Sequence, residues 1–295
     1  MSEKPKIGFI GLGNMGFPMC RNLIGGGYAV TVNDLAAAAC EEMAKLGAAV
    51  AATPAELAAG ADVVITCLPN SRIVEAVFGG ENGLAAGFRA GSVFIDMSSS
   101  DPESTRQLGK QMAALGGEML DAPISGGITG AAAGTLTIMV GGSEALYERM
   151  LPVFQTMGSK IVHMGALGAG DTVKVINNFI SGCTMAATTE AVAMGVKAGL
   201  DPHRIISVLQ QGTGKSDAAE RKYPKFVFEG KNANFTIDLL CKDIRTYLKV
   251  AQSLNVPTAL SSEVYNLWEI TRAEGGKDIV DIVDLFERWC GVSIR

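Results

Sequence analysis

The chain has 295 residues, of which 48% are hydrophobic and 19% charged, and its formal net charge is -5. This length suffices for two domains, because domains typically span about 100–200 residues. The 36 glycines follow no three-residue period and the apolar content is high, which excludes collagen-like and disordered chains. A mildly acidic chain without Lys/Arg-rich runs lacks the electrostatic footprint of nucleic-acid binding, so we expect no nucleic-acid partner.

The sequence predicts a soluble, cytoplasmic protein. Its six scattered cysteines form no Cys-x-x-Cys pair, and we interpret them as small core residues in a reducing compartment. The N-terminus leads directly into an apolar, strand-like run at 6–10, without room for a signal peptide. The longest apolar stretch, 182–199, is interrupted by threonines, Glu190 and Lys197, so we expect no membrane partner.

Strands and helices are predicted to alternate in the first half of the chain. The segments at 35–47 and 100–117 have helical spacing and end in Gly, and the second of them begins at Ser100 or Asp101 with Pro102 in its first turn. This alternation predicts an α/β fold with a Rossmann-type, doubly wound and mostly parallel sheet. The predicted strands are 6–10, 29–33, 62–68, 92–97, 135–141 and 160–163.

Beyond about residue 165 the remaining chain is predicted to be helical. One long helix is predicted over 168–199, and further helices start at Pro202, span about 237–254, and start at Pro257 and at Asp278. We therefore expect a sheet domain over residues 1–165 and an all-α C-terminal domain over 166–295. The long helix has more apolar residues than one packed face needs, and its surplus would pack on the sheet or on a second copy. We expect a homo-oligomer, either a dimer or a tetramer.

A glycine motif follows the first predicted strand and opens the first predicted helix. In the pattern G-x-G-x-x-G, the first glycine permits a tight turn, the second lets the backbone approach a pyrophosphate, and the third lets helix and strand pack closely. The helix N-terminus would offer N–H groups to the phosphates. A glycine-rich turn without a ligand is the alternative. The predicted cofactor-binding residues are Gly11, Leu12, Gly13, Asn14, Met15 and Gly16.

Asp34 follows the second predicted strand, where a carboxylate would accept hydrogen bonds from the adenosine ribose hydroxyls. Its charge would repel the 2′-phosphate of NADP, and the next residue is Leu35 rather than an arginine. We therefore expect NAD as the cofactor. An N-cap for the following helix is an alternative role for the same side chain.

Six blocks of sequence resemble the β-hydroxyacid dehydrogenase family and run over most of the chain in the family's order. The resemblance implies an NAD-binding Rossmann domain followed by a helical domain similar to that of 6-phosphogluconate dehydrogenase, which contributes to substrate binding and oligomerisation. The blocks are GLGNMGFPM (11–19), CLPN (67–70), FIDMSSSDP (94–102), DAPISGGITGAAAGTLTIMVGG (121–142), GAGDTVKVINN (168–178) and CKD (241–243).

The resemblance also implies which residues contact the cofactor. Leu68 and Pro69 would line it, while Ser98 and Ser99 would approach the nicotinamide ribose. The family usually has Ser-Thr at the latter site, so Ser99 keeps the hydroxyl and loses a methyl group. Lys242 would reach the cofactor and substrate region from the helical domain. A turn that caps the next helix is the alternative role of the serines.

Two further blocks would bind and convert the substrate. Ser125, Gly126 and Gly127 offer a hydroxyl and successive unobstructed N–H groups, which suit a carboxylate. The family uses this segment for its substrate's carboxylate, although a glycine loop before a helix is the simpler alternative. The resemblance makes Lys174 the catalytic residue, and Asn178, four residues later on the same helix face, would help to hold the substrate. A solvated helix face is the usual alternative for a lysine.

The implied reaction is the NAD-dependent interconversion of a small 3-hydroxy carboxylic acid and its semialdehyde or oxo acid. Hydride would pass to the nicotinamide while Lys174 acts as general base in oxidation and as general acid in reduction. No metal site is expected, because the two histidines, His163 and His203, lie far apart in the sequence and suit structural roles.

The region near the substrate tail departs from the family pattern and leaves alternatives open. Asp217 stands where the family has a tryptophan, and Arg245 replaces a small or apolar residue. A more polar substrate would explain these changes, with Lys215 or Arg245 contacting its second polar group. Alternatives are a semialdehyde reductase of the tartronate or succinate type, working mainly in the reductive direction, and a non-catalytic dehydrogenase-like module. The retained Lys174 disfavours the module.

Overall fold

The computed structural model describes residues 4–295, and the chain forms two compact units. The first unit ends at Lys174 and the second comprises Val175–Arg295. The division falls inside one long helix, α9 (Ala169–Lys197), rather than in a linker. The sequence-based boundary between residues 165 and 166 lies just before this helix and stays a prediction.

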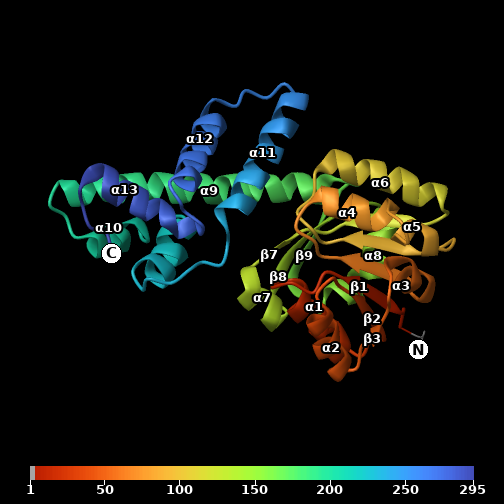
Figure 1. Ribbon diagram of the computed structural model, residues 1–295. Coiled ribbons are helices and arrows are strands. Elements are labelled where there is room, and N and C mark those ends of the chain that lie inside the picture. The colour runs from red at the N-terminus through yellow and green to blue at the C-terminus, as the bar shows by residue number, and fades with distance from the viewer. Residues whose placement is uncertain (1–3) are drawn as a thin grey trace. The chain divides into compact units, whose positions relative to one another are not determined.

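The first unit contains a mostly parallel sheet with the strand order β3-β2-β1-β4-β5-β6-β8-β7, and β9 pairs with β8 (Figure 1). Pairing is parallel from β3 through β6, whereas β8 is antiparallel to β6 and β7 and parallel to β9. The strands are β1 (Ile7–Ile10), β2 (Val30–Asn33), β3 (Ala49–Val50), β4 (Val63–Thr66), β5 (Val93–Asp96), β6 (Glu118–Asp121), β7 (Ile124–Ser125), β8 (Leu136–Gly141) and β9 (Gly158–Gly165).

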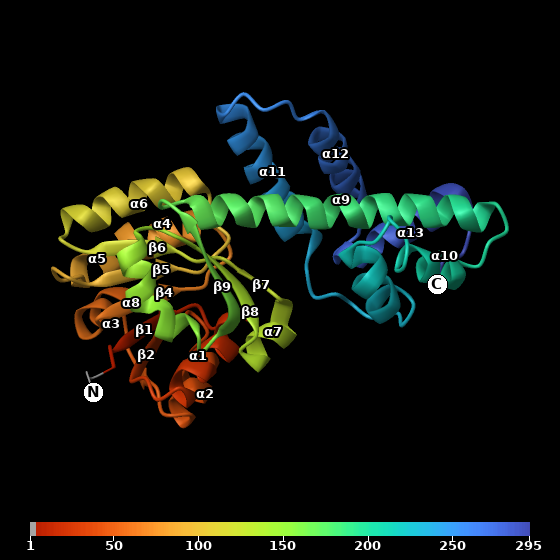
Figure 2. The same ribbon diagram turned by 180° about the vertical axis from the view of Figure 1, so that it is seen from behind.

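Helices cover both faces of this sheet, as Figures 1 and 2 show. Successive strand residues point to opposite faces, so both faces carry apolar side chains that a helix layer can cover. One face, with Phe9 and Ile65, packs against α1 (Gly16–Gly25), α2 (Ala37–Lys45), α7 (Gly127–Ala133) and α8 (Glu144–Phe154). The other face, with Ile10 and Val64, packs against α3 (Pro54–Gly60), α4 (Ser71–Gly79), α5 (Leu84–Gly87) and α6 (Pro102–Ala114). Two separate cores confirm the predicted doubly wound sheet.

A side-chain cap explains where one of these helices begins, and the structure excludes a predicted cap of another. Asp101 Oδ1 accepts a hydrogen bond from the Glu103 N–H at 2.9 Å, and Pro102 occupies the first position of α6, as predicted. The alternative role of Asp34 as a helix cap is wrong, because α2 begins at Ala37 and its N-cap is Ala36.

The regular elements of the second unit are all helices, apart from one isolated bridge between Thr236 and Asp278. Its core contains Met185, Tyr223 and Trp268. The helices α11 and α12 lie side by side in both views (Figures 1 and 2). The segments are α10 (Pro202–Leu209), the π-helix η1 (Ala218–Val227), α11 (Ile237–Ser253), α12 (Ala259–Ala273), the short 3-10 turn η2 (Ile279–Asp281) and α13 (Ile282–Cys290). Of these segments, η1 is not predicted by the sequence.

The predicted long helix is present as α9, and part of its apolar surplus is exposed. Ile176, Ile180 and Met194 have exposed fractions of 44%, 52% and 66%. By length and composition alone, α9 is long and apolar enough to cross a membrane, whereas the sequence predicts no membrane span. Half of its most apolar window, 50%, is buried within the protein, a pattern that core helices of soluble proteins share.

Candidate active site

The carboxyl ends of four neighbouring strands define the candidate cofactor site in the first unit. The register places the last residue of β1, Ile10, beside Asn33 of β2 and Thr66 of β4, and Thr66 beside Asp96 of β5. The glycine motif, Asp34, Leu68 and Ser99 directly follow these strand ends, so the structure brings them to one edge of the sheet. In open α/β sheets this edge is where ligands bind.

The three glycines of the motif fit a dinucleotide. Gly11 has φ +99°, and a Cβ there would lie 2.3 Å from the Cys67 carbonyl oxygen. A Cβ at Gly16 would lie 1.8 Å from the Gly11 oxygen, so only glycine permits this approach of helix to loop. Nothing lies within 4 Å of a Cβ built at Gly13, which leaves the backbone open toward a ligand. These are the three roles that pyrophosphate binding requires.

Backbone N–H groups orient the Asp34 carboxylate. Its Oδ2 accepts a hydrogen bond from the Leu12 N–H at 2.6 Å, and its Oδ1 accepts one from the Ala36 N–H at 2.7 Å. A carboxylate oxygen can accept more than one hydrogen bond, so both atoms keep capacity for ribose hydroxyls. The neighbouring Leu35 side chain is fully exposed and supplies no positive charge for a 2′-phosphate.

The serines after β5 position the Leu68 loop. The Ser98 hydroxyl oxygen accepts a hydrogen bond from the Leu68 N–H at 2.9 Å, and the Ser98 N–H donates to Asp96 Oδ1 at 3.1 Å. The Ser100 hydroxyl donates to Asp96 Oδ2 at 2.6 Å. Ser98 and Ser100 are buried, whereas Ser99 is partly exposed. Of the three serines, Ser99 is therefore the most exposed.

The predicted carboxylate-binding segment forms a glycine turn at the end of β7. Ser125 is the last residue of this strand, and Gly126 and Gly127 have φ values of +132° and +65°. Such left-handed values favour glycine. A Cβ built at Gly127 meets nothing within 4 Å. The turn is therefore open at Gly127, two residues after Ser125.

Lys174 and Asn178 lie one turn apart on α9, and both are buried. In the second unit, the Asn178 Nδ2 donates a hydrogen bond to Asp243 Oδ2 at 2.5 Å. The Lys242 ammonium lies 2.9 Å from Asp243 Oδ1. The buried Asp243 thus orients two predicted site residues. Sequence reasoning missed this role, although Asp243 stands in the CKD block directly after Lys242.

The divergent charged residues have partners within the second unit. Burial alone would raise the pKa of Asp217, but Arg221 binds its carboxylate through two nitrogens, at 2.7 and 2.9 Å, and the net effect lowers this pKa. Lys215 pairs with Glu220 at 2.8 Å. Arg245 donates hydrogen bonds to the Tyr265 hydroxyl at 3.0 and 2.8 Å. The suggested contact of Lys215 or Arg245 with a polar substrate stays a prediction.

Other catalytic groups are not assembled in the described part of the chain. Within residues 4–295, no group of three or more His, Cys, Asp or Glu side chains could hold a metal ion. His163 contacts the Gly142 carbonyl at 2.8 Å, and the His203 ring packs against the Phe228 ring in a tilted arrangement with ring centroids 3.9 Å apart. Burial raises the pKa of the Cys67 thiol to about 12, which leaves it protonated and unreactive near neutral pH.

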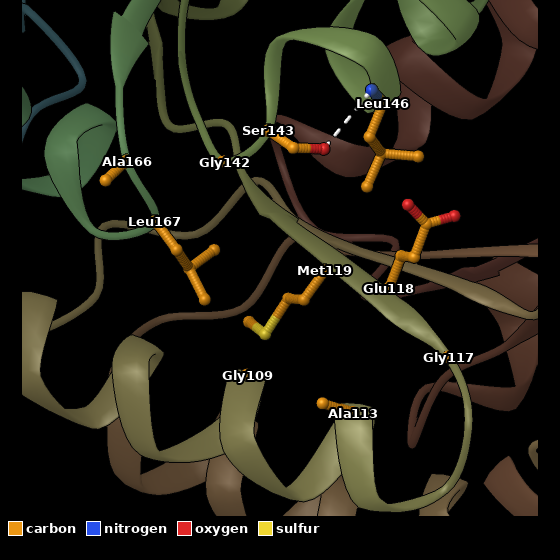
Figure 3. A pocket seen from close by; sticks show the side chains of 10 residues that line it. All are labelled: Gly109, Ala113, Gly117, Glu118, Met119, Gly142, Ser143, Leu146, Ala166 and Leu167. Atoms are coloured by element: carbon orange, nitrogen blue, oxygen red, sulfur yellow. Dashed lines mark hydrogen bonds between the residues drawn. The ribbon is translucent and has the colours of Figure 1, made fainter.

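A separate apolar cavity of about 500 Å³ in the first unit includes none of the predicted site residues (Figure 3). Met119, Leu146 and Leu167 are among its lining residues, and Ser143 caps α8 with a hydrogen bond from the Leu146 N–H at 3.3 Å. This cavity is therefore distinct from the strand ends and glycine turns that carry the predicted site residues of the first unit.

Fold and site together define a Rossmann oxidoreductase with a helical second unit, and comparisons with known proteins agree. Residues 6–165 match the model of the NAD binding domain of 6-phosphogluconate dehydrogenase. Residues 168–286 match the model described as NAD-binding of NADP-dependent 3-hydroxyisobutyrate dehydrogenase.

Similar whole proteins identify the family. The 2-(hydroxymethyl)glutarate dehydrogenase of Eubacterium barkeri is 41% identical over 100% of this chain and 99% of its own length. The mitochondrial 3-hydroxyisobutyrate dehydrogenase of Mus musculus is 35% identical, covering 93% of this chain and 84% of that protein. A structure of Mycobacterium tuberculosis 3-hydroxyisobutyrate dehydrogenase with L-serine aligns with a TM-score of 0.89 at 32% identity, covering 96% of this chain and 99% of that one. The chain belongs to the β-hydroxyacid dehydrogenase family, and it is an NAD-dependent dehydrogenase of hydroxy acids.

Proposed function

We propose that this chain oxidises the primary alcohol of a small 3-hydroxy carboxylic acid to a semialdehyde, with Lys174 as general base, and catalyses the reverse reaction with Lys174 as general acid. The observation that carries this proposal is the buried pair of Lys174 and Asn178 on one face of α9, in a chain whose glycine motif is open at Gly13. A buried lysine can exchange a proton with a substrate hydroxyl as a general acid or base.

The names of the relatives narrow the substrate class. 2-(Hydroxymethyl)glutarate, 3-hydroxyisobutyrate and L-serine each carry a hydroxymethyl group on the carbon that bears the carboxylate. A 3-hydroxypropanoate substituted at its second carbon is therefore the proposed substrate. In this proposal Ser125, Gly126 and Gly127 bind the carboxylate, and Asn178, held by Asp243, orients the hydroxymethyl arm.

We propose the cofactor-binding residues from the family resemblance and from their positions in the chain. Gly11–Gly16 would hold the pyrophosphate, Asp34 the adenosine ribose, and Leu68, Pro69 and Ser99 the nicotinamide side, with Lys242 contributing from the helical unit. NAD supplies the hydride acceptor. The oriented carboxylate of Asp34, with Leu35 beside it, supports NAD over NADP.

The first experiment measures NADH formation with a panel of 3-hydroxy acids, and NADH consumption with the corresponding semialdehydes. We expect turnover with NAD, less with NADP, and a loss of about 10²–10⁴-fold or more in Lys174→Ala, because a general acid/base contributes rate enhancement of that order. NAD binding, measured by fluorescence titration, should persist in this variant.

The matched control is Lys197→Ala, which removes an exposed lysine from the last turn of the same helix. Normal turnover in Lys174→Ala would refute the catalytic role of Lys174. Absence of turnover with every 3-hydroxy acid and every semialdehyde, in a wild-type protein that binds NAD, would refute the substrate class.

We further propose that the protein is a cytoplasmic homo-oligomer. Support for association comes from the exposed apolar residues of α9, and support for a reducing compartment comes from the six cysteines, which are all free thiols. Cell fractionation tests the location, and sedimentation velocity tests the assembly.

A further inference from the structure

The start of α9 is capped by a side chain from a distant strand. Gly168 directly precedes α9 and has no side chain with which to bind the free N–H groups of the first turn. Asp121, the last residue of β6, accepts hydrogen bonds from two backbone N–H groups at this end of the helix. Its Oδ1 accepts a hydrogen bond from the Gly168 N–H at 2.7 Å, and its Oδ2 accepts one from the Asp171 N–H at 2.8 Å.

Two glycines make room for this carboxylate. A Cβ at Gly141 would lie 2.3 Å from Asp121 Oδ1. A Cβ at Gly170 would lie 2.2 Å from the Met139 carbonyl oxygen and 2.9 Å from Asp121 Oδ2. Larger residues would separate α9 from the sheet, so β8 and α9 both leave space around the fully buried Asp121.

A second buried acid continues the connection toward α6. The Asp171 Oδ2 accepts a hydrogen bond from the Thr105 hydroxyl at 2.7 Å, and its Oδ1 accepts one from the Ser100 N–H at 3.3 Å. Ser100 in turn donates to Asp96, which binds the Ser98 N–H, and Ser98 binds the Leu68 N–H. Hydrogen bonds therefore run without a break from the loop after β4 to the first turn of α9.

We propose that Asp121 and Asp171 are positioning residues that hold the first turn of α9, and with it Lys174, in a fixed geometry relative to the Leu68 loop. Asp171 stands one turn before Lys174, so a shift of the capped turn moves the lysine with it. The inference rests on the proposed catalytic role of Lys174. A misplacement of about 1 Å at a reacting group can cost about 10²-fold in rate.

The energetics support a positioning role over a purely stabilising one. Burial and the neighbouring acids raise the pKa of both Asp121 and Asp171, with hydrogen-bond donors opposing the shift. Burying carboxylates near one another is unfavourable for folding, whereas an apolar contact of similar volume is often neutral or stabilising. A satisfied polar network, in contrast, specifies one arrangement of the elements that it joins.

The test compares Asp121→Asn with Asp62→Asn. The amide introduced by Asp121→Asn would place an NH₂ group against one of the two backbone N–H donors, so the cap is lost on one side. Asp62 also accepts a backbone N–H, from Lys6 at 2.9 Å, but it is exposed and outside the network. We expect kcat to fall by about 10²-fold in Asp121→Asn, with the Kd for NAD and the KM for substrate within about threefold of wild type. Asp62→Asn should keep its kcat.

A milder pair of variants covers the case in which Asp121→Asn does not fold. Thr105→Val removes one hydroxyl from Asp171 at nearly constant volume, and Thr105→Ser retains it. We expect a smaller fall of kcat in Thr105→Val, with unchanged NAD affinity, and restored kcat in Thr105→Ser. A role in stability alone would lower the melting temperature of Thr105→Val and leave kcat unchanged well below it, and that result would overturn the inference.

The two proposals fail in different ways. If Lys174→Ala is inactive but Asp121→Asn and Thr105→Val turn over normally, the positioning role is wrong and the catalytic role stands. If Lys174→Ala turns over normally, the catalytic role is wrong, and the positioning role, which depends on it, falls as well.

Discussion

The Lys222 side chain is buried, and within residues 4–295 a single carboxylate, that of Asp217, lies within 4 Å of its ammonium group. Its side chain lies in η1, and its ammonium donates hydrogen bonds to the Ser181 hydroxyl at 2.7 Å and carbonyl at 3.2 Å, with the Asp217 carboxylate 3.6 Å away. Burial lowers the pKa of Lys222 from its ordinary value of 10.5 to about 8, and Asp217 offsets this only in part. The helical unit thus contains a titratable group close to neutral pH.

This pKa predicts how stability depends on pH. Between about pH 8 and about pH 10.5 the unfolded chain binds one more proton at Lys222 than the folded chain, so this residue makes the free energy of unfolding rise with pH. Relative to Lys222→Met, wild type should therefore gain stability in urea unfolding between about pH 7 and about pH 10. Lys225→Met, at an exposed position of the same helix, is the control. Parallel pH profiles of wild type and Lys222→Met would contradict the lowered pKa.

Single residues also mark the limit of sequence reasoning. The glycine motif and Asp34 were predictable because their neighbours along the chain supply the context of strand, turn and helix. Asp121 and Asp171 were not singled out, because their partners lie 47 to 71 residues away. Asp243 was missed for the same reason, since its contact with Asn178 spans 65 residues.

At the scale of elements, the contact between β1 and α1 decides whether the dinucleotide site can form. Gly16 opens α1 and packs against the Gly11 carbonyl, whereas Gly25, the last residue of the same helix, faces open space. Gly16→Ala should therefore displace the glycine loop and abolish NAD binding in calorimetric titration. Gly25→Ala should bind NAD normally and gain up to about 1 kcal/mol of stability from helix propensity. Equal NAD affinity in both variants would contradict the packing role of Gly16.

Element prediction succeeded where apolar runs were long and failed where they were short. The strands at β1, β2, β4, β5, β8 and β9 and the long helix were predicted near their observed bounds. β3 and β7 have two residues each, too few for a periodic pattern. The sequence does not predict β6, because Glu118 and Asp121 flank only two apolar residues. Pairing with β5 on one side and β8 on the other stabilises this segment as a strand.

At the scale of the whole molecule, the exposed apolar residues of α9 predict association. Ile180 is 52% exposed in a helix that is otherwise rich in core residues. We expect wild type to sediment as a dimer or tetramer and Ile180→Glu to dissociate, because a buried charge without a partner is unfavourable at an apolar interface. Val208→Glu adds the same charge at an exposed position of α10 and should leave the assembly intact. An oligomer unaffected by Ile180→Glu would exclude this face of α9 as the interface.

The unbroken course of α9 has a consequence for recombination between relatives. Because the division at Lys174 falls within a helix, a chimaera that joins the units of two relatives there has its junction inside α9. A chimaera joined near this point must preserve helical phase, since one inserted residue between Lys174 and Asn178 would rotate the second side chain by roughly 100° around the helix axis. Insertions and deletions among relatives are therefore expected in the loops of either unit rather than in α9.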